Sequence, residues 1–380
     1  MKSWIEVSEE RLAENFRVLA EAVGAETQVL AVVKANAYGH GADLCAVALV
    51  RAGARWLGVA DACEGVPVRR ALDAAGLVAE ILVMCGLIPE DVALIAEHRL
   101  TPVVWTVEQA SLLRGCAGVR VHVEIDTGMG RQGVRPGAEL DAVLDAISAA
   151  GIVLDGVMTH FCAAEVVGSE LTRMQERRFE TAVGQVRARG LRLGWVHAGS
   201  SSSVDNPARD GDWLLDLAKS VGARAMVRCG ISLYGYCLPV EECGELPPRV
   251  RAALKPVMQW KTRVLDVRDV AEGESIGYNA MFRATQPMRV ALLPVGYSDG
   301  LRRGLSSTNV RPGGWVMLGG KPAAILGRIS MNLTTVDVSG IDGVQVGDEV
   351  VLLGDGVTAD DHARLAGTIS YEILCGVRAG

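Results

Sequence analysis

The sequence predicts an α/β plus β protein in which an N-terminal TIM (β/α)8 barrel is followed by a mostly β C-terminal domain. Two observations support this prediction. Over the first two-thirds of the chain, eight short apolar runs alternate with helical segments, which is the pattern of buried parallel strands and their connecting helices. From about residue 240 onward, helical periodicity is scarce and β-rich runs are separated by Gly and Pro.

The eight apolar runs each have the length of a strand, and the segments between them have helical character. Eight consecutive βα units favour a closed barrel, although alternation alone is also compatible with a doubly wound open sheet. Glycines follow several helical segments, where helix C-caps are expected. The runs are 29–33, 56–60, 80–85, 101–105, 120–125, 154–159, 193–198 and 225–231; the clearest helical segments are 42–53, 137–151 and 169–190; the glycines are Gly53, Gly76, Gly151 and Gly190.

The C-terminal part carries five β-rich runs. We therefore place the barrel domain at 10–240 and the β domain at 241–380, with LPPRVRAALKP (246–256) as the connection. The runs are KTRVLDVRDV (261–270), RVALLPVG (289–296), PAAILG (322–327), TTVDVSG (334–340) and GDEVVLLG (347–354).

Composition narrows the classes of function. The net charge of −7 gives no reason to expect a nucleic-acid partner. The mean hydropathy of +0.24 comes from abundant Ala, Val and Leu, and no stretch approaches the roughly 18 apolar residues of a membrane span. The N-terminus lacks the apolar core of a signal peptide, and the nine cysteines, an odd number without a CxxC pair, indicate reduced thiols. We expect a cytoplasmic protein with no membrane partner.

Polar residues collect where the apolar runs end, which in such a barrel is where chemistry takes place. Lys34 directly follows the first run and suits Schiff-base chemistry. For a lone lysine, however, a side chain snorkelling at the barrel rim is the commoner explanation. The remaining strand-end residues are Tyr38, Asp126, Arg131, His160, His197, the serines 200–203, Arg228 and Tyr234.

Two of these strand ends could bind an anion. HAGSSSSVDNP (197–207) is a hydroxyl-rich turn that offers backbone N–H groups and hydroxyls to a phosphate, and a plain helix N-cap is the alternative. Arg228 could pair with a carboxylate, a phosphate or a ring nitrogen, or form a structural ion pair. The sequence has no metal-ligand spacing and no nucleotide-binding glycine loop, so we predict no catalytic metal.

Together these segments resemble the alanine racemase family, from residue 4 to residue 374. The most specific match is AVVKANAYGHG (31–41), which is similar to the family's cofactor-lysine motif. The other blocks follow in the family's order: IDTGMGRQG (125–133), MTHF (158–161), RCGISLYG (228–235), SIGYNAMFRA (275–284), LPVGYSDG (293–300), GRISMN (327–332) and GTISYE (367–372).

The resemblance implies a pyridoxal 5′-phosphate (PLP) enzyme that acts on a small amino acid as a homodimer with shared active sites. It implies that residues 1–9 join the β domain, that Lys34 binds PLP covalently, and that Arg228 faces the pyridine nitrogen. Arg131 would lie near the phenolic oxygen and the substrate, with His160 nearby. The residues expected around the phosphate are Tyr38, Ser201, Gly230, Ile231 and Tyr371, and those expected on the C-terminal domain are Tyr278 and Met331, both from the partner chain, with Tyr297 and Asn332 in support.

The implied reaction is interconversion of L-alanine and D-alanine, which supplies D-alanine for peptidoglycan. Racemisation removes a proton on one face of the α-carbon and returns one on the other, so two opposed bases, Lys34 and Tyr278, are expected. An arginine is unlikely to give up a proton to the pyridine nitrogen, so Arg228 would keep that nitrogen largely unprotonated and suppress transamination.

Several positions depart from the family pattern. Glu124 stands where many members have a lysine that becomes carbamylated and orients the arginine corresponding to Arg131; a permanent carboxylate could do the same. Ser200, Cys229 and Asn332 also differ, and Asn332, beside Met331, bears on substrate choice.

Three alternatives stay open. The first is a serine or broad-specificity racemase on the same scaffold, although Tyr371 narrows the site as in alanine-preferring members. The second is a non-enzymatic PLP carrier on a lone barrel, which would lack the β domain and Tyr278. The third is a PLP decarboxylase on a related barrel.

Overall fold

The computed structural model describes residues 2–116, 118–208, 211–242, 244 and 246–379. The chain divides into two compact units. The barrel unit comprises 12–37 and 41–255, and the β unit comprises 1–11, 38–40 and 256–380. The predicted domain boundary at 240/241 stays a prediction.

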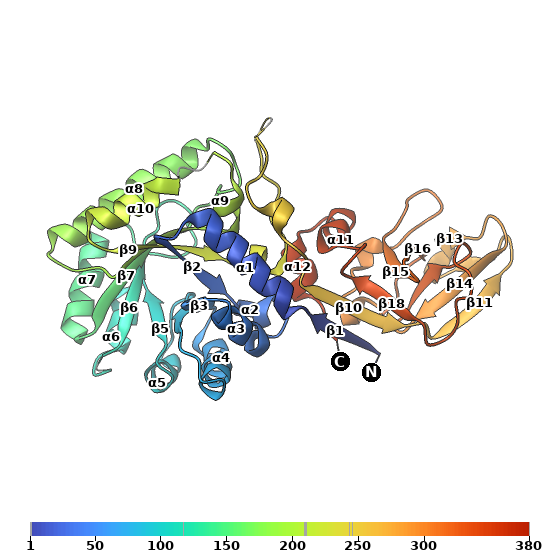
Figure 1. Ribbon diagram of the computed structural model, residues 1–380, viewed down its shortest axis with the longest axis horizontal. Coiled ribbons are helices and arrows are strands. Elements are labelled where there is room, and N and C mark those ends of the chain that lie inside the picture. Colours follow the sequence, from blue (N-terminus) through green and yellow to red (C-terminus); the bar gives the residue numbers. More distant parts are fainter. Residues whose placement is uncertain (1, 117, 209–210, 243, 245, 380) are drawn as a thin grey trace. The chain divides into compact units, whose positions relative to one another are not determined.

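The barrel unit contains a closed barrel of eight parallel strands, β2 to β9 (Figure 1). Each of the eight apolar runs forms one of these strands, so the TIM-barrel prediction is confirmed and the open sheet is excluded. The strands are β2 (Thr27–Val32), β3 (Trp56–Val59), β4 (Glu80–Val83), β5 (Thr101–Val104), β6 (Arg120–Glu124), β7 (Val153–Met158), β8 (Trp195–Ser200) and β9 (Arg224–Cys229).

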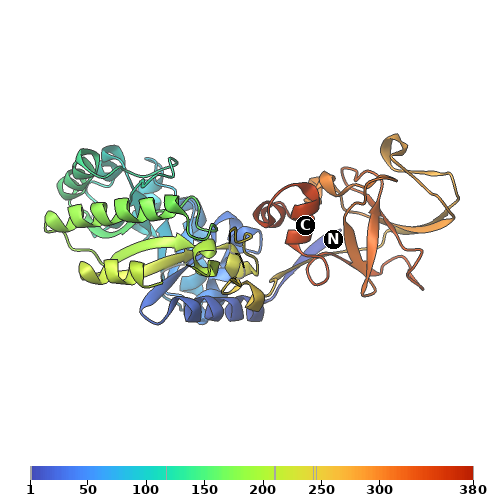
Figure 2. The ribbon, with the colours of Figure 1, turned by 90° about the horizontal axis from the view of Figure 1, so that it is seen from above.

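Helices surround the barrel strands, as α7 and α8 do in green in Figures 1 and 2. Several begin at side-chain caps, such as Asp61 before α4 and Ser169 before α8, and Gly151 ends α7 in the left-handed conformation. The helices are α1 (Glu9–Val23), α2 (Lys34–Tyr38), α3 (Ala42–Arg51), α4 (Ala62–Ala74), α5 (Asp91–Glu97), α6 (Val107–Leu112), α7 (Ala138–Ala150), α8 (Glu170–Ala188), α9 (Ser201–Asp205) and α10 (Gly211–Ser220), with short 3₁₀ turns η1 (Ile231–Tyr234) and η2 (Arg251–Ala253).

The β unit is built on an eight-stranded antiparallel sheet in the order β1-β10-β18-β15-β16-β17-β14-β11, with a separate β12-β13 pair. The N-terminal strand β1 pairs with β10, so the two ends of the sequence contribute to one sheet. The strands are β1 (Ser3–Val7), β10 (Met258–Arg263), β11 (Asp266–Val270), β12 (Ser275–Ile276), β13 (Phe282–Arg283), β14 (Met288–Leu293), β15 (Trp315–Leu318), β16 (Lys321–Leu326), β17 (Thr334–Asp337) and β18 (Glu349–Leu353).

The β unit differs from the sequence prediction in detail. The predicted run 261–270 is divided between β10 and β11, and β12, β13 and β15 had no predicted counterpart. Two helices, α11 (Ala359–Ala366) and α12 (Ser370–Cys375), close the chain. These helices span eight and six residues, too few for a clear helical period, and α11 begins at a capping box on Thr358.

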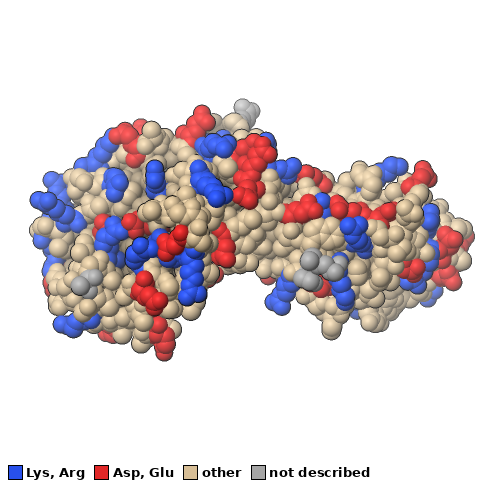
Figure 3. Space-filling model, turned by 60° about the horizontal axis from the view of Figure 1, so that its bottom comes forward, with Lys and Arg blue, Asp and Glu red and all other residues tan. Residues whose placement is uncertain are grey.

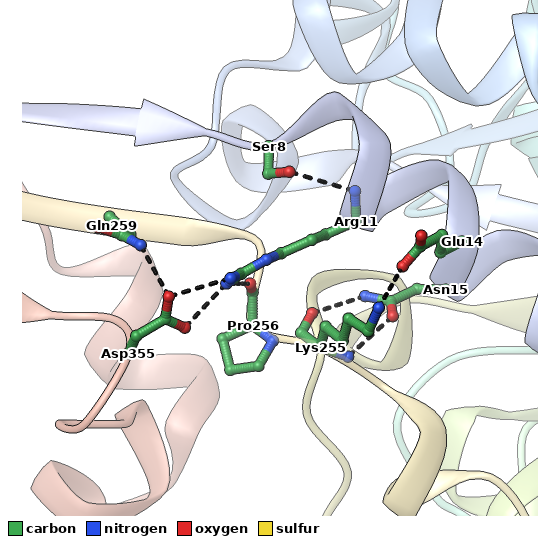
Figure 4. A network of polar contacts seen from close by, with 8 residues as sticks. All are labelled: Ser8, Arg11, Glu14, Asn15, Lys255, Pro256, Gln259 and Asp355. Carbon is green, nitrogen blue, oxygen red and sulfur yellow. Dashed lines mark hydrogen bonds and ion pairs between the residues drawn. The ribbon is translucent and has the colours of Figure 1, made fainter.

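The chain passes from one unit to the other at 11/12, 37/38, 40/41 and 255/256. At the first and last of these points, residues on each side are bonded within their own unit (Figure 4). In the β unit, the two terminal guanidinium nitrogens of Arg11 donate to the Asp355 carboxylate at 2.9 and 3.0 Å. In the barrel unit, Asn15 binds the backbone of Lys255 through its amide oxygen and nitrogen, each at 2.9 Å.

The surface drawn in Figure 3 carries basic and acidic side chains interspersed on each unit, without a large area of one sign. No helix in the described residues has the length and apolar character needed to cross a membrane. Of the cysteines, Cys45, Cys229 and Cys237 are buried, and Cys243 lies outside the described residues.

Candidate active site

Lys34 follows β2 at the carboxyl end of the barrel and begins an unusual left-handed turn. The four residues from Ala35 to Tyr38 have φ between 52° and 55°, although none of them is glycine. Each such residue costs about 1–2 kcal/mol, so the surrounding structure must hold the turn in place. Backbone strain of this kind directly after a lysine at a strand end is typical of a functional site.

Hydrogen bonds hold this turn. The Glu64 carboxylate accepts from the N–H of Ala35 at 2.7 Å and from the N–H of Ala60, at the end of β3, at 2.8 Å. The Asn36 side chain accepts from Ala42 N–H at 2.9 Å. Lys34 itself makes no ion pair within the described parts of the chain, so its amine is available to a ligand.

A cluster of hydroxyls and backbone N–H groups follows β8 and β9. The Ser201 hydroxyl, 2% exposed, accepts from the N–H of Gly230 at 3.0 Å and of Ser232 at 3.2 Å. The Ser232 hydroxyl lies 2.8 Å from it. Ile231, between these residues, is buried. The two N–H groups thus hold the Ser201 hydroxyl in place next to the Ser232 hydroxyl, and hydroxyl donors of this kind can bind a phosphate.

Arg228, at the end of β9, is buried among hydrogen-bond acceptors. It donates to the Thr159 carbonyl at 2.6 Å and contacts His160 Nδ1 at 3.2 Å and His197 Nδ1 at 3.4 Å. His197 Nε2 in turn lies 2.8 Å from His122 Nδ1. A line of polar groups thus runs through the barrel interior to Arg228.

These histidines are held neutral. Burial lowers the pKa of His197 well below its ordinary value, with the charge of Arg228 acting in the same direction. Burial also lowers the pKa of His122. For His160, burial and the positive charges of Arg228, Arg131 and Lys34 lower the pKa to about 3. A neutral imidazole has one donor and one acceptor nitrogen, so each contact in the line has a defined direction.

Glu124 ends β6 and is 2% exposed. Burial raises the pKa of its carboxyl, and a hydrogen bond from Gln132 and the charges of Arg228 and Arg131 partly offset this rise. The Gln132 side chain donates a hydrogen bond to the Glu124 carboxylate. Arg131 is exposed, so the direct contact between Glu124 and Arg131 stays a prediction.

The β unit holds the other predicted site residues. The rings of Tyr38 and Tyr371 have centroids 5.9 Å apart, and Tyr38 is buried. Tyr278 begins the 3₁₀ turn η3 (Tyr278–Ala280) and its side chain is 63% exposed. Gly277, with φ of 77°, places this turn against the backbone of Arg328, where a Cβ would lie 3.0 Å from the amide nitrogen.

Tyr297, Met331 and Asn332 lie on two loops that are bonded to each other. Tyr297 N–H donates to the Ser330 carbonyl at 3.0 Å, and the Ser298 hydroxyl donates to the Met331 carbonyl at 2.8 Å. The Asn332 amide donates to the Ser298 hydroxyl at 2.7 Å. Tyr297 and Met331 are 44% and 55% exposed, so this loop pair presents both side chains at the surface of the β unit.

The barrel unit thus brings together Lys34, Glu124, His160, Ser201, Arg228, Gly230 and Ile231 at strand ends, with Arg131 on the loop after β6. Sequence reasoning did not identify Glu64, Gln132 or His122 as part of the site. Glu64 binds backbone groups, His122 binds a side chain 75 residues away, and Gln132 binds the Met84 carbonyl and the Glu124 carboxylate only because the loop after β6 folds back, so no local pattern marks them.

A barrel with a lysine and a pair of buried serine hydroxyls at its strand ends, together with a separate β unit, defines a class of two-domain barrel enzymes. Residues 7–238 match the family model described as alanine racemase, N-terminal domain, and residues 257–380 match the one described as alanine racemase, C-terminal domain. The chain belongs to the alanine racemase family and is an isomerase of that family.

Individual relatives agree over nearly the whole chain. The alanine racemase of Syntrophobacter fumaroxidans is 36% identical, covering 99% of this chain and 95% of the relative. The crystal structure of alanine racemase from Bacillus anthracis with bound L-Ala-P has a TM-score of 0.84 and 29% identity, covering 99% of this chain and 92% of that one. The structure from Bartonella henselae with covalently bound pyridoxal phosphate has a TM-score of 0.81 and 25% identity, covering 100% and 98%.

Proposed function

We propose that this enzyme binds PLP through Lys34 and interconverts L-alanine and D-alanine by a two-base mechanism, supplying D-alanine for peptidoglycan in the cytoplasm. The observation that carries the proposal is the availability of two proton-transfer groups on different units. Lys34 makes no ion pair within the described residues, and Tyr278 is 63% exposed.

The residues of the barrel unit fit the cofactor. The hydroxyls of Ser201 and Ser232 form a pair of donors suited to a phosphate, and Lys34 supplies the amine for an aldehyde. Arg228 presents a buried guanidinium whose acceptors already hold it in place, suited to face the ring nitrogen without giving up its proton. Among the described residues no group of three His, Cys, Asp or Glu is placed to hold a metal ion.

PLP, when bound, withdraws electrons from the α-carbon of the attached amino acid. Lys34 then moves a proton on one face of that carbon and Tyr278 moves one on the other. Arg228 would face the ring nitrogen and keep its own proton, and an arginine in this place would therefore disfavour transamination. Arg131 and Met331 would bind the substrate, and Tyr38 and Tyr371 would help to hold the phosphate.

We propose a homodimer in which Tyr278 and Met331 complete the partner's active site. Their exposure on the β unit supports this arrangement, since both side chains are free of covering structure there. The alternative of a serine or broad-specificity racemase rests on Asn332, whose amide is held by Ser298 beside Met331.

Racemisation of a panel of L-amino acids, measured as D-product, tests the function. Alanine turned over with the highest kcat/KM is the expected result. Serine or larger amino acids turned over equally well would favour the alternative, and D-product from none of them would overturn the proposal.

A further inference from the structure

The loop after β6 folds back onto the strand from which it came. Val134 N–H donates to the Glu124 carbonyl at 2.9 Å, and Asp126 N–H donates to the Val134 carbonyl at 3.0 Å. Gly133 has φ of 110°, and a Cβ there would lie 2.6 Å from the Asp126 nitrogen. The close return therefore requires glycine at 133, and it sets where residues 131 and 132 lie.

Gln132 uses its side-chain nitrogen to bridge two strand ends. One hydrogen bond goes to the carbonyl of Met84, just after β4, at 3.0 Å, and the other goes to the Glu124 carboxylate at the end of β6. An amide nitrogen has two N–H donors, so both are used. The residue that precedes Gln132 is Arg131, and the bridge therefore anchors the backbone that carries Arg131.

The carboxylate that Gln132 binds is costly to bury. Glu124 is 2% exposed, and a buried charge needs hydrogen bonds or partners of opposite charge. The charged groups acting on it are Arg228 from β9 and Arg131 and Asp126 from the loop, with Asp126 opposing the other two. The Gln132 side chain supplies a hydrogen bond to this carboxylate.

We propose that Gln132 is a positioning residue, which stabilises the Glu124 carboxylate and fastens the Arg131 loop to the barrel. It acts through these two neighbours and does not touch the substrate. Its effect on catalysis rests on the function proposed above, whereas its effect on Glu124 belongs to the folded chain alone.

A double-mutant cycle in the PLP-loaded enzyme tests the catalytic part. Gln132→Met keeps the length but removes both donors, and we expect kcat/KM to fall roughly tenfold or more. The acidic limb of its pH profile should move to higher pH, because Glu124 ionises later without its donor. In a Glu124→Gln background the same change should add little. Independent, multiplicative effects or an unmoved acidic limb would overturn the proposal.

Gln109→Met is the matched control. Gln109 is also a glutamine of the barrel unit, on α6, and its amide oxygen accepts from the N–H of Trp105, one residue after β5, at 2.8 Å. Within the described parts of the chain its side chain bonds no charged group. It should lower stability without moving the pH profile. If Gln109→Met moved the acidic limb of the pH profile as far as Gln132→Met does, general destabilisation of the barrel would explain both shifts.

Unfolding of the cofactor-free protein separates this proposal from the proposed function. The pKa of Glu124 is near 4.5 in the unfolded chain and higher in the folded chain. The free energy of unfolding therefore falls as pH rises from about 4.5 through the folded pKa, because the buried carboxyl must then ionise. Gln132→Met raises that pKa further, so its urea midpoint should fall further below that of the wild type at about pH 8 than at about pH 5. The Gln109→Met difference should be constant with pH. A constant difference for Gln132→Met would contradict the assignment whether or not the enzyme racemises alanine.

Discussion

Arg228 Nη1 lies 3.4 Å from His197 Nδ1, and because a guanidinium has only donors, that nitrogen must be the acceptor. The proton of His197 is therefore on Nε2, which donates to His122 Nδ1 at 2.8 Å. His122 then carries its own proton on Nε2, which lies 3.7 Å from Asp155. One arginine thus determines the tautomers of two buried histidines.

Removing the imidazole of His197, which accepts from Arg228, tests this arrangement. His197→Leu should leave Arg228 without one of its partners and lower kcat/KM by roughly 10- to 100-fold, as expected for a lost hydrogen bond to a charged group. His197→Gln should recover part of the loss, because an amide offers both an acceptor and a donor. Steady-state kinetics with bound PLP verified by absorbance measures both variants. Wild-type kinetics in His197→Leu would show that Arg228 does not depend on this contact.

The β unit has its own pH dependence at His362. Burial lowers the pKa of this histidine from 6.5 to about 4. At about 1.4 kcal/mol per pKa unit, this corresponds to about 3–4 kcal/mol of stability, which is present above pH 6.5 and lost as pH falls toward 4. The reason is that the unfolded chain takes up a proton that the folded chain does not.

His362→Gln keeps a side-chain donor for the Trp315 carbonyl, which His362 Nε2 contacts at 3.4 Å, but cannot titrate. The difference in unfolding free energy between wild type and variant should shrink as pH falls from 6.5 toward 4. Urea unfolding at a series of pH values measures it, and a difference independent of pH would be inconsistent with a neutral buried imidazole.

Glu124 tests whether a permanent carboxylate replaces a carbamylated lysine. From the sequence, Glu124 could orient Arg131; in the structure Arg131 is exposed, and the buried cation that acts on Glu124 is Arg228. Glu124→Gln should lower activity strongly because Arg228 then loses a compensating charge. Bicarbonate should not rescue this variant, whereas Glu124→Lys should regain activity as bicarbonate is added. Full activity in Glu124→Gln would show that the carboxylate is not needed.

Lys34 should be the residue that carries PLP. Borohydride reduction of the lysine–cofactor bond, followed by peptide mapping, should place the pyridoxyl label there. The structure gives a reason for this selectivity: Lys255 is paired with Glu14, Lys261 with Glu6 and Glu349, and Lys321 donates to the Gly340 carbonyl. A label on any of these three would contradict the assignment.

The barrel could be predicted from the sequence because buried parallel strands form continuous apolar runs, and all eight were found. The β unit was harder. Strands β12 and β13 have two residues each, too few to show the alternation of a strand, and α12 has six, too few to show the repeat of a helix. The division of 261–270 into β10 and β11 also leaves no local signal, because both halves are β-rich.

The candidate site was predictable where a residue follows a strand, as Lys34 and Arg228 do. The supporting contacts were not. Glu64 and Ala35 are 29 residues apart, and His122 and His197 are 75 apart, so only the closed barrel brings them together. Gln132 is close to Glu124 in the sequence, but its role depends on the return of the loop at Gly133.

In the proposed mechanism, Lys34 of one chain and Tyr278 of another act on opposite faces of one substrate. Lys34→Ala and Tyr278→Phe should each abolish racemisation in both directions, and Tyr278→Phe should still bind PLP. A dimer that contains one chain of each variant has one active site with both bases intact, because each variant supplies what the other lacks. Mixing the two inactive proteins under conditions of demonstrated subunit exchange should therefore restore about a quarter of wild-type activity, since half of the dimers are mixed and each has one intact site. No recovery after exchange would contradict the shared, two-base site.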